Sequence, residues 1–168
     1  MKPADRMEGK APDFAAPTAC PRCRGSGVVT APAGEYAQAS LCVCSQRCLL
    51  CRGARYLFER DEFGRDLVRM CACEQRRARI RLYNEAAIPA KYYDARLSAA
   101  QSDRNNLEAF RTLRMLAEDY ARGEKGILLM GKPGVGKTHL LAAFLHDLVF
   151  RHGVPALFRD FFHLLSDL

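Results

Sequence analysis

The fold is decided by the stretch Ile127-Leu128-Leu129-Met130-Gly131-Lys132-Pro133-Gly134-Val135-Gly136-Lys137-Thr138. It begins with a short apolar run of the kind found in buried parallel strands. Its second half matches GxxxxGK followed by Ser or Thr, a glycine loop that cradles phosphates. A helix-like stretch follows from Lys137 to about His152. Strand, loop and helix in this order predict a P-loop core of the α/β class with a parallel sheet.

The residue types in the loop indicate how a nucleotide would be held. Glycines let backbone N–H groups turn inward to form an anion nest. Lys137 is placed to reach the β and γ phosphates of ATP, and Thr138 is placed to give its hydroxyl to Mg²⁺. The predicted nucleotide-binding residues are Gly131, Lys132, Pro133, Gly134, Val135, Gly136, Lys137, Thr138 and His139.

All eight cysteines belong to an internal repeat near the start of the chain. The first copy reads CPRCRGSG from Cys20 and ends in CVC at residues 42–44, and the second reads CLLCRGAR from Cys48 and ends in CAC at residues 71–73. Two thiolates at positions i and i+3 of a tight turn can face one tetrahedral ion, and two such pairs complete the closed shell of structural zinc.

The repeat therefore predicts two zinc ions. Clustered cysteines in a reducing compartment argue for metal rather than disulfides. The favoured ligand sets are Cys20, Cys23, Cys42 and Cys44 for one ion, and Cys48, Cys51, Cys71 and Cys73 for the other. A cross-braced pairing remains open at this stage, and so do buried or disulfide-linked cysteines without metal.

Each copy reads as a small zinc-ribbon-like hairpin. In the second copy, Tyr56 to Arg60 and Asp66 to Met70 are predicted strands around a turn. In the first copy, Val28 to Thr30 and Ala39 to Cys44 flank a turn at residues 32–34. Hairpins this short are expected to depend on the metal for their stability.

The predicted organisation is an α/β chain with five parts. These are a disordered N-terminal segment (1–19), a first zinc module (20–46), a second zinc module (47–75), a helical connector (76–122) and the N-terminal part of the ATPase core (123–168). Within the connector region we expect a helix from Glu74 to Ala87, stopped by Pro89. A second helix is expected to start near Ser102 or Asp103 and to end at Gly123.

The charge is concentrated in one third of the chain. The net charge is +7, and residues 47–96 carry 12 basic and 7 acidic residues, or +5. The densest group is Arg76, Arg77, Arg79 and Arg81, which we interpret either as a surface for single-stranded DNA or an acidic partner, or as a solvated helix face. The chain shows neither a signal peptide nor an apolar run of membrane length, so we expect a cytoplasmic protein without membrane contact.

Three segments together resemble a known family. GKPGVGKTHLLAA after ILLM resembles the AAA+ core of DnaC-type bacterial helicase loaders and of their relatives, the IstB transposition helpers. Residues 87–92, AIPAKY, resemble the IPxxY segment that precedes that core, and the cysteine pattern resembles the zinc modules of DnaI-type loaders. The resemblance implies ATP binding, a replicative helicase as partner, single-stranded DNA as its track, and a homo-oligomer through the complete ATPase core.

The chain also departs from the family pattern. Val154 to Phe158 fits the second strand of the core. A Walker B strand would be four apolar residues ending in Asp-Glu, but Phe158 is followed by Arg159 and Asp160, without an acidic pair. The sensor and arginine finger are also missing, so the sequence leaves ATP hydrolysis open and looks like the N-terminal part of a longer protein. Two alternatives remain: a zinc-binding nucleic-acid or protein adaptor without ATPase activity, and an IstB-like transposition helper.

Overall fold

A computed structural model describes residues 20–99, 106–120 and 126–166 of the chain. The predicted disordered segment at 1–19, the helix cap at Ser102 or Asp103 and the stop at Gly123 lie outside these residues. The strands are β1 (Val28–Ala33), β2 (Tyr36–Leu41), β3 (Tyr56–Arg60) and β4 (Asp66–Met70). The helices are α1 (Ala72–Glu85), α2 (Leu107–Glu118), α3 (Lys137–Asp147) and α4 (Phe161–Ser166), with 3-10 turns η1 (Val43–Ser45) and η2 (Ala90–Tyr92) and a π-helical turn η3 (Leu148–His152).

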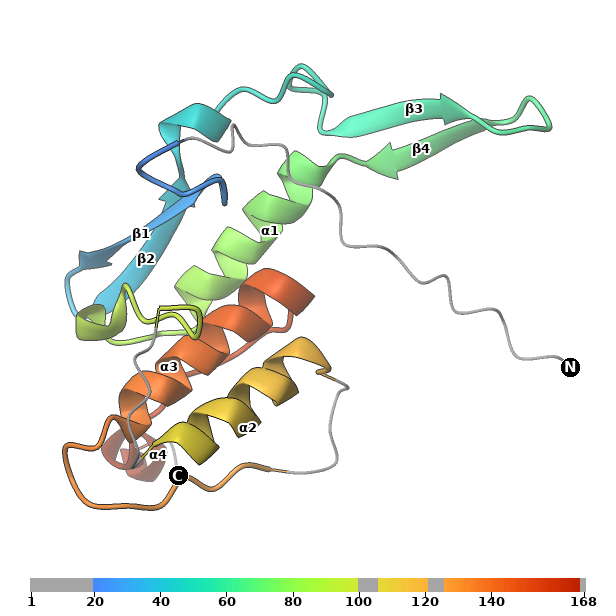
Figure 1. Ribbon diagram of the computed structural model, residues 1–168. Coiled ribbons are helices and arrows are strands. Elements are labelled where there is room, and N and C mark those ends of the chain that lie inside the picture. Colours follow the sequence, from blue (N-terminus) through green and yellow to red (C-terminus); the bar gives the residue numbers. More distant parts are fainter. Residues whose placement is uncertain (1–19, 100–105, 121–125, 167–168) are drawn as a thin grey trace, which may run out of the picture.

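The four strands form two separate antiparallel hairpins (Figure 1). In the second hairpin Tyr56 lies opposite Met70 and Arg60 opposite Asp66, and both strands have the predicted bounds. In the first hairpin the strands extend further toward the turn than predicted, so that Ala33 pairs with Tyr36. At its other end β2 stops at Leu41 and does not reach Cys44, because the chain turns into η1 there. Gly34 at the turn has a φ of 63°, a left-handed conformation that a side chain would strain.

Helix α1 connects the two halves of the molecule (Figure 1). It starts at the end of the second cysteine repeat and packs against β2 and the η3 turn. Tyr83 and Ala86 at its C-terminal end are fully buried, and the Tyr83 ring lies 5.3 Å from that of Phe150. The helix lies two residues earlier than predicted because Ala87 has a φ of 51°, which ends the helical path.

The first hairpin is part of the main core, whereas the second extends away from it. Ala37 and Ala39 of β2 are buried in the same apolar cluster as Tyr83 and Ile88. In contrast, every residue of β3 and β4 is exposed except Leu57, which is half-buried. The second hairpin accordingly projects from the top of the molecule (Figure 1).

The two strands expected around the glycine loop are not formed in the described part of the chain. Residues 127–130 and 154–158 have no regular secondary structure, so the predicted parallel sheet is not present there. A strand needs a hydrogen-bonded neighbour, and these two segments do not pair with each other or with the hairpins. Instead, Phe158 donates its backbone N–H to Ala86 at 2.7 Å, which ties this segment to the end of α1.

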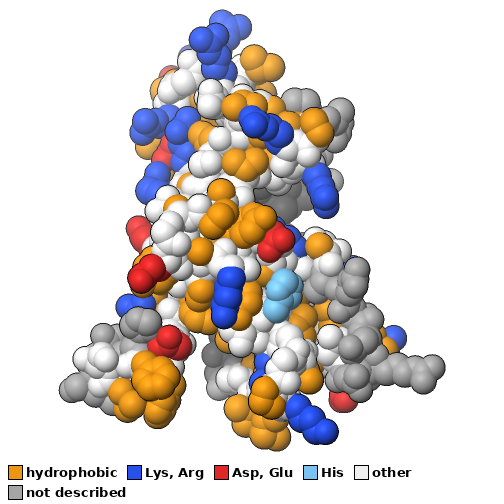
Figure 2. All heavy atoms as spheres, turned by 90° about the vertical axis from the view of Figure 1, so that its left-hand side faces the viewer, with side chains coloured by type: hydrophobic (Ala, Val, Ile, Leu, Met, Phe, Trp, Pro, Cys, Tyr) orange, Lys and Arg blue, Asp and Glu red, His pale blue; other side chains and the backbone are white. Residues whose placement is uncertain are grey.

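Apolar side chains from these segments remain at the surface. Leu128 and Met130 are each 82% exposed, and Phe162 in α4 is 78% exposed. Figure 2 shows hydrophobic side chains grouped at the lower end of the molecule, where Figure 1 places the glycine loop. In the part of the chain that the structure describes, no helix combines the length and apolar character needed to cross a bilayer.

Candidate metal centres and phosphate-binding loop

The eight cysteines form two compact clusters, and each cluster contains one copy of the repeat. The sulfur atoms within a cluster all lie within 4.8 Å of one another. Individual Sγ–Sγ distances are 3.8 Å for Cys20 and Cys42 and 3.6 Å for Cys48 and Cys71. Four sulfurs at 2.3 Å from a tetrahedral zinc would be about 3.8 Å apart. The donor set and spacing therefore fit one zinc ion per cluster.

This geometry decides between the two pairings that the sequence left open. The first cluster is Cys20, Cys23, Cys42 and Cys44, and the second is Cys48, Cys51, Cys71 and Cys73. The sulfurs are grouped as in the sequential assignment and not as in the cross-braced one. All eight cysteines are free thiols in the structure.

The repeat in the sequence is a repeat in backbone geometry. Arg24 donates its N–H to Cys20 at 2.8 Å, and Arg52 donates to Cys48 at 3.0 Å. Both arginines have a φ of 49°, and Gly25 that follows has a φ of 84°. A left-handed glycine is typical of such turns, but the left-handed arginine before it carries no sequence signal, because only Asn, Asp and Gly commonly adopt that region.

The surroundings of the sulfur atoms promote ionisation of one thiol in each cluster. Backbone N–H groups of Cys23 and Arg22 lower the pKa of Cys20 to about 6. Burial opposes ionisation of Cys51, but hydrogen bonds from the backbone of Gly53 and Arg55 lower its pKa to about 6.

Cys44 and Cys73 resist ionisation because they are desolvated and negative charges would crowd together. A hydrogen bond from Ser45 favours the thiolate of Cys44, yet burial and the neighbouring thiols raise its pKa to about 12. Burial and then Cys51 raise the pKa of Cys73 as well. A divalent cation supplies the positive charge that four thiolates need, so such a cluster is suited to a metal.

The glycine loop has the geometry of an anion nest. Gly134 and Gly136 have φ values of 84° and 87°, and Gly136 is the N-cap of α3. The Lys137 ammonium donates to the carbonyl oxygens of Gly131 and Lys132 at 2.8 and 2.9 Å. Lys137 thus folds back over the loop, where a bound phosphate would replace these two carbonyls as its partner. Thr138 is exposed at the first turn of α3, open to a cation.

The segment resembling IPxxY lies directly beside this loop. Tyr92 in η2 makes an edge-to-face contact with His139, with ring centroids 6.2 Å apart. On its other side the Tyr92 ring lies 6.5 Å from that of Phe158. His139 follows Thr138 in the chain, so Tyr92 supports the helix turn that carries the phosphate-binding residues.

The four arginines predicted as a contact surface divide into two pairs on α1. Arg76 and Arg79 line a cavity toward α3, and Arg79 donates to the Phe150 carbonyl at 2.7 Å. Arg77 does not line that cavity, and Arg81 is exposed with its guanidinium 3.5 Å from Glu74. Sequence reasoning did not find Arg96, which lines the same cavity from a loop without a motif.

The family follows from comparison with known proteins. Residues 63–168 match the family model described as "IstB-like ATP binding protein", which is well over half of the chain. The chain belongs to this IstB-like ATP-binding family. Comparison with curated proteins and with solved structures gave no match.

The IstB-like match covers the glycine loop and α1, and it starts inside the second hairpin. The first cysteine cluster lies outside it, and the second contributes Cys71 and Cys73 to it. The IstB-like chain therefore combines an ATP-binding family domain with two four-cysteine clusters that fit a metal ion.

Proposed function

We propose that this chain is an ATP-binding loader that places a hexameric replicative helicase on single-stranded DNA. The observation that supports the proposal is that helix α1 directly connects the second hairpin and its cysteine cluster to the helix of the phosphate-binding loop. Helix α1 begins at Ala72, directly after Cys71 of the second cluster, and its other end packs on α3, which begins at Lys137. A loader needs such a connection, because ATP binding has to alter how a partner is held.

The contacts between α1 and the ATP-binding part support a rigid connection. Tyr83 lies against His146 and Phe150 of α3 and η3 at ring-centroid distances of 5.7 and 5.3 Å. Arg79 and Ala86 each bond to the backbone of that part, at Phe150 and Phe158. The groups in these contacts are fully or partly buried, and such contacts fix the position of α1 better than exposed ion pairs would.

ATP would be held by the glycine loop and Mg²⁺ by the Thr138 hydroxyl. When bound, Mg²⁺ neutralises charge on the β and γ phosphates. Because the sequence offers no acidic pair after the glycine loop to activate water, we expect weak binding of Mg-ATP and no meaningful turnover by the 168-residue chain.

A second candidate is a transposition helper of the IstB type. The family description favours it, since the match names IstB-like proteins. The paired cysteine clusters favour the loader, because the resemblance to DnaI-type loaders rests on them.

A helicase-transfer assay separates the two candidates. Purified chain and the replicative helicase of the same organism are incubated with primed circular single-stranded DNA, and DNA-bound helicase is counted after gel filtration. We expect ATP-dependent transfer that Lys137→Ala abolishes, and that Cys71→Ser abolishes without loss of ATP binding. Transfer that is unaffected by Lys137→Ala, or ATP-dependent capture of a transposase with no helicase transfer, would reject the loader.

A further inference from the structure

A cavity of about 240 Å³ lies where the first cysteine module meets the ATP-binding part. Four parts of the chain contribute to it: the loop before β1 with the first residue of β1, helix α1, the loop after η2, and the end of α3 with the η3 turn. Its lining residues are Gly25, Ser26, Val28, Arg76, Arg79, Arg96, His146 and Phe150. The lining contains three guanidinium groups and no carboxylate.

The other titratable group in the lining does not add charge at neutral pH. Burial lowers the pKa of His146 to about 4, although Asp147, 3.3 Å away, acts in the opposite direction. Burial also lowers the pKa of Arg79 and of Arg96, which remain cationic in any case. Like charges around one cavity repel, and this repulsion is stronger where water is partly excluded.

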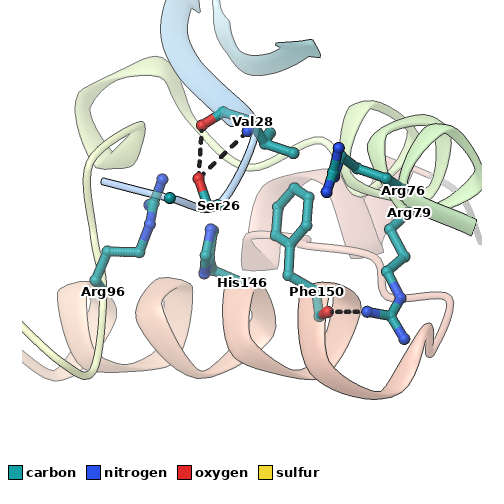
Figure 3. A pocket seen from close by; sticks show the side chains of 8 residues that line it. Ser26, Val28, Arg76, Arg79, Arg96, His146 and Phe150 are labelled. Carbon is teal, nitrogen blue, oxygen red and sulfur yellow. Dashed lines mark hydrogen bonds between the residues drawn. The ribbon is translucent and has the colours of Figure 1, made fainter. Parts of the chain in front are cut away.

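The guanidinium groups approach the cavity from opposite sides. In Figure 3, Arg96 lies beside Ser26 on one side, Arg76 lies near Val28 on the other, and His146 and Phe150 are between them. Arg96 is fixed in place because it donates to Thr30 Oγ1 at 2.7 Å and to the Ala95 carbonyl at 2.8 Å. A site whose side chains are already positioned loses little freedom when a ligand binds.

Gly27 keeps space for the Arg76 guanidinium. A Cβ at this position would lie 2.8 Å from Arg76 Cζ and 2.5 Å from Ser45 Oγ. The φ of Gly27 is +72°, which also favours glycine. The backbone of the first module is thus shaped so that the guanidinium lies against it.

We propose that this cavity binds a phosphate group. Planar guanidinium groups match phosphate oxygens in paired hydrogen bonds, and two of them facing across a cavity can hold one phosphate between them. The site is separate from the glycine loop, because His146 follows Lys137 by nine residues, or about 13 Å along a helix. It does not depend on the loader activity proposed above.

The phosphate has two sources that share this chemistry: a free phosphorylated small molecule or the backbone of a nucleic acid. In both cases the ligand would contact the first cysteine module and α3 together. Binding of the ligand would therefore strengthen the contact between the first cysteine module and the ATP-binding part of the chain.

The test uses the zinc-loaded full chain with Lys137→Ala, so that the glycine loop does not contribute. Inorganic pyrophosphate is titrated by calorimetry, with zinc content and circular dichroism as checks on folding. We expect one site, weakened at least tenfold by Arg76→Gln and restored in part by Arg76→Lys. Arg77→Gln is the matched control on the same helix outside the cavity, and its affinity should stay within twofold.

A second measurement covers the case in which Arg76→Gln does not fold. Pyrophosphate should slow amide exchange at residues 25–28 and 146–150 of the Lys137→Ala chain. A ten-residue oligothymidylate without terminal phosphates then separates the sources: a backbone site binds it in an Arg76-dependent way, and a small-molecule site does not. Pyrophosphate affinity unchanged by Arg76→Gln, or absence of both binding and protection, would overturn the proposal.

Discussion

Removing the metal should unfold the second hairpin and leave the first one formed. The two cysteine clusters are alike in geometry, so a metal bound at each would constrain both hairpins equally. What differs is how each hairpin is attached to the rest of the protein. Chelation under reducing conditions therefore exposes the stability that each hairpin has without its metal.

The first hairpin keeps several contacts that do not involve cysteine. Its hydrogen bonds to the body are Ala37 N–H to Ile88 O at 2.7 Å, Ala90 N–H to Glu35 O at 2.8 Å, Ala39 N–H to Asn84 Oδ1 at 2.7 Å, Asn84 Nδ2 to Ala39 O at 3.2 Å, and Arg96 Nη2 to Thr30 Oγ1 at 2.7 Å. At about 1 kcal/mol each, these five bonds contribute about 5 kcal/mol. That corresponds to more than three orders of magnitude in an opening equilibrium.

The second hairpin has no comparable attachment among the described residues. Its strands have no buried residue, and its ion pairs, such as Arg60 with Asp66 at 2.9 Å, are exposed. Exposed pairs contribute about 0–1 kcal/mol. An isolated two-stranded hairpin is marginally stable in water at best.

Hydrogen exchange followed by mass spectrometry measures this difference directly. After chelation, peptides covering residues 56–70 should exchange at the rate of an unfolded chain, while peptides covering 28–41 stay protected by about a thousandfold or more. Cys71→Ser should reproduce the loss in 56–70 alone, and Cys42→Ser should leave most protection in 28–41. Equal loss of protection in both hairpins, or a second hairpin that stays protected, would refute the reasoning.

Four further predictions concern metal, nucleotide, pH and DNA. The purified chain should hold two zinc ions and Cys71→Ser one, by atomic absorption; a wild-type value near one would reject the two-site assignment. Lys137→Ala should weaken Mg-ATP binding at least tenfold in calorimetry with unchanged zinc content. The pKa of His146 is about 4 in the folded protein and 6.5 in the unfolded chain, so the unfolded state binds more protons below pH 6.5. The free energy of unfolding should therefore fall by about 3 kcal/mol from pH 7 to pH 4. Denaturant titrations between pH 5 and 7.5 should show part of this fall in the wild type and a smaller fall in His146→Leu. Replacing Arg77 and Arg81 with alanine should lower the salt slope of single-stranded DNA binding by about 1.4, at 0.7 per contact, and an unchanged slope would place the contact elsewhere.

The cysteine clusters and the glycine loop were predictable because their information is local. CxxC pairs and GxxxxGKT each specify a backbone turn within a few residues, and the structure places the sulfurs of each repeat copy together as expected. The bounds of β3 and β4 were also predicted correctly, since turn residues and alternating side chains mark both strands.

The parts that the sequence did not reveal depend on contacts between distant segments. The strands expected at 127–130 and 154–158 require neighbours, and apolar composition alone cannot supply them. Arg96 has no motif around it, and it reaches its cavity only because η2 carries the chain past the first hairpin. The division of the α1 arginines into a pair that lines the cavity and a pair that does not follows from the packing of α1 on the η3 turn, which periodicity does not encode.

Helix α1 is held by different forces at its two ends. This difference decides how far along the helix the loss of the metal would disturb the structure. Its first turn contains Cys73 and follows Cys71, so a metal bound at the second cluster would fix that end. Its last turns are fixed by Tyr83 and Ala86, which are fully buried without any help from metal. A helix of 14 residues is only marginally stable alone, so loss of the second metal should fray its first turn. The fraying should stop where Arg79 and Tyr83 contact η3 and α3. The glycine loop should then keep its ATP affinity. The second hairpin should lose the fixed orientation that a partner would need.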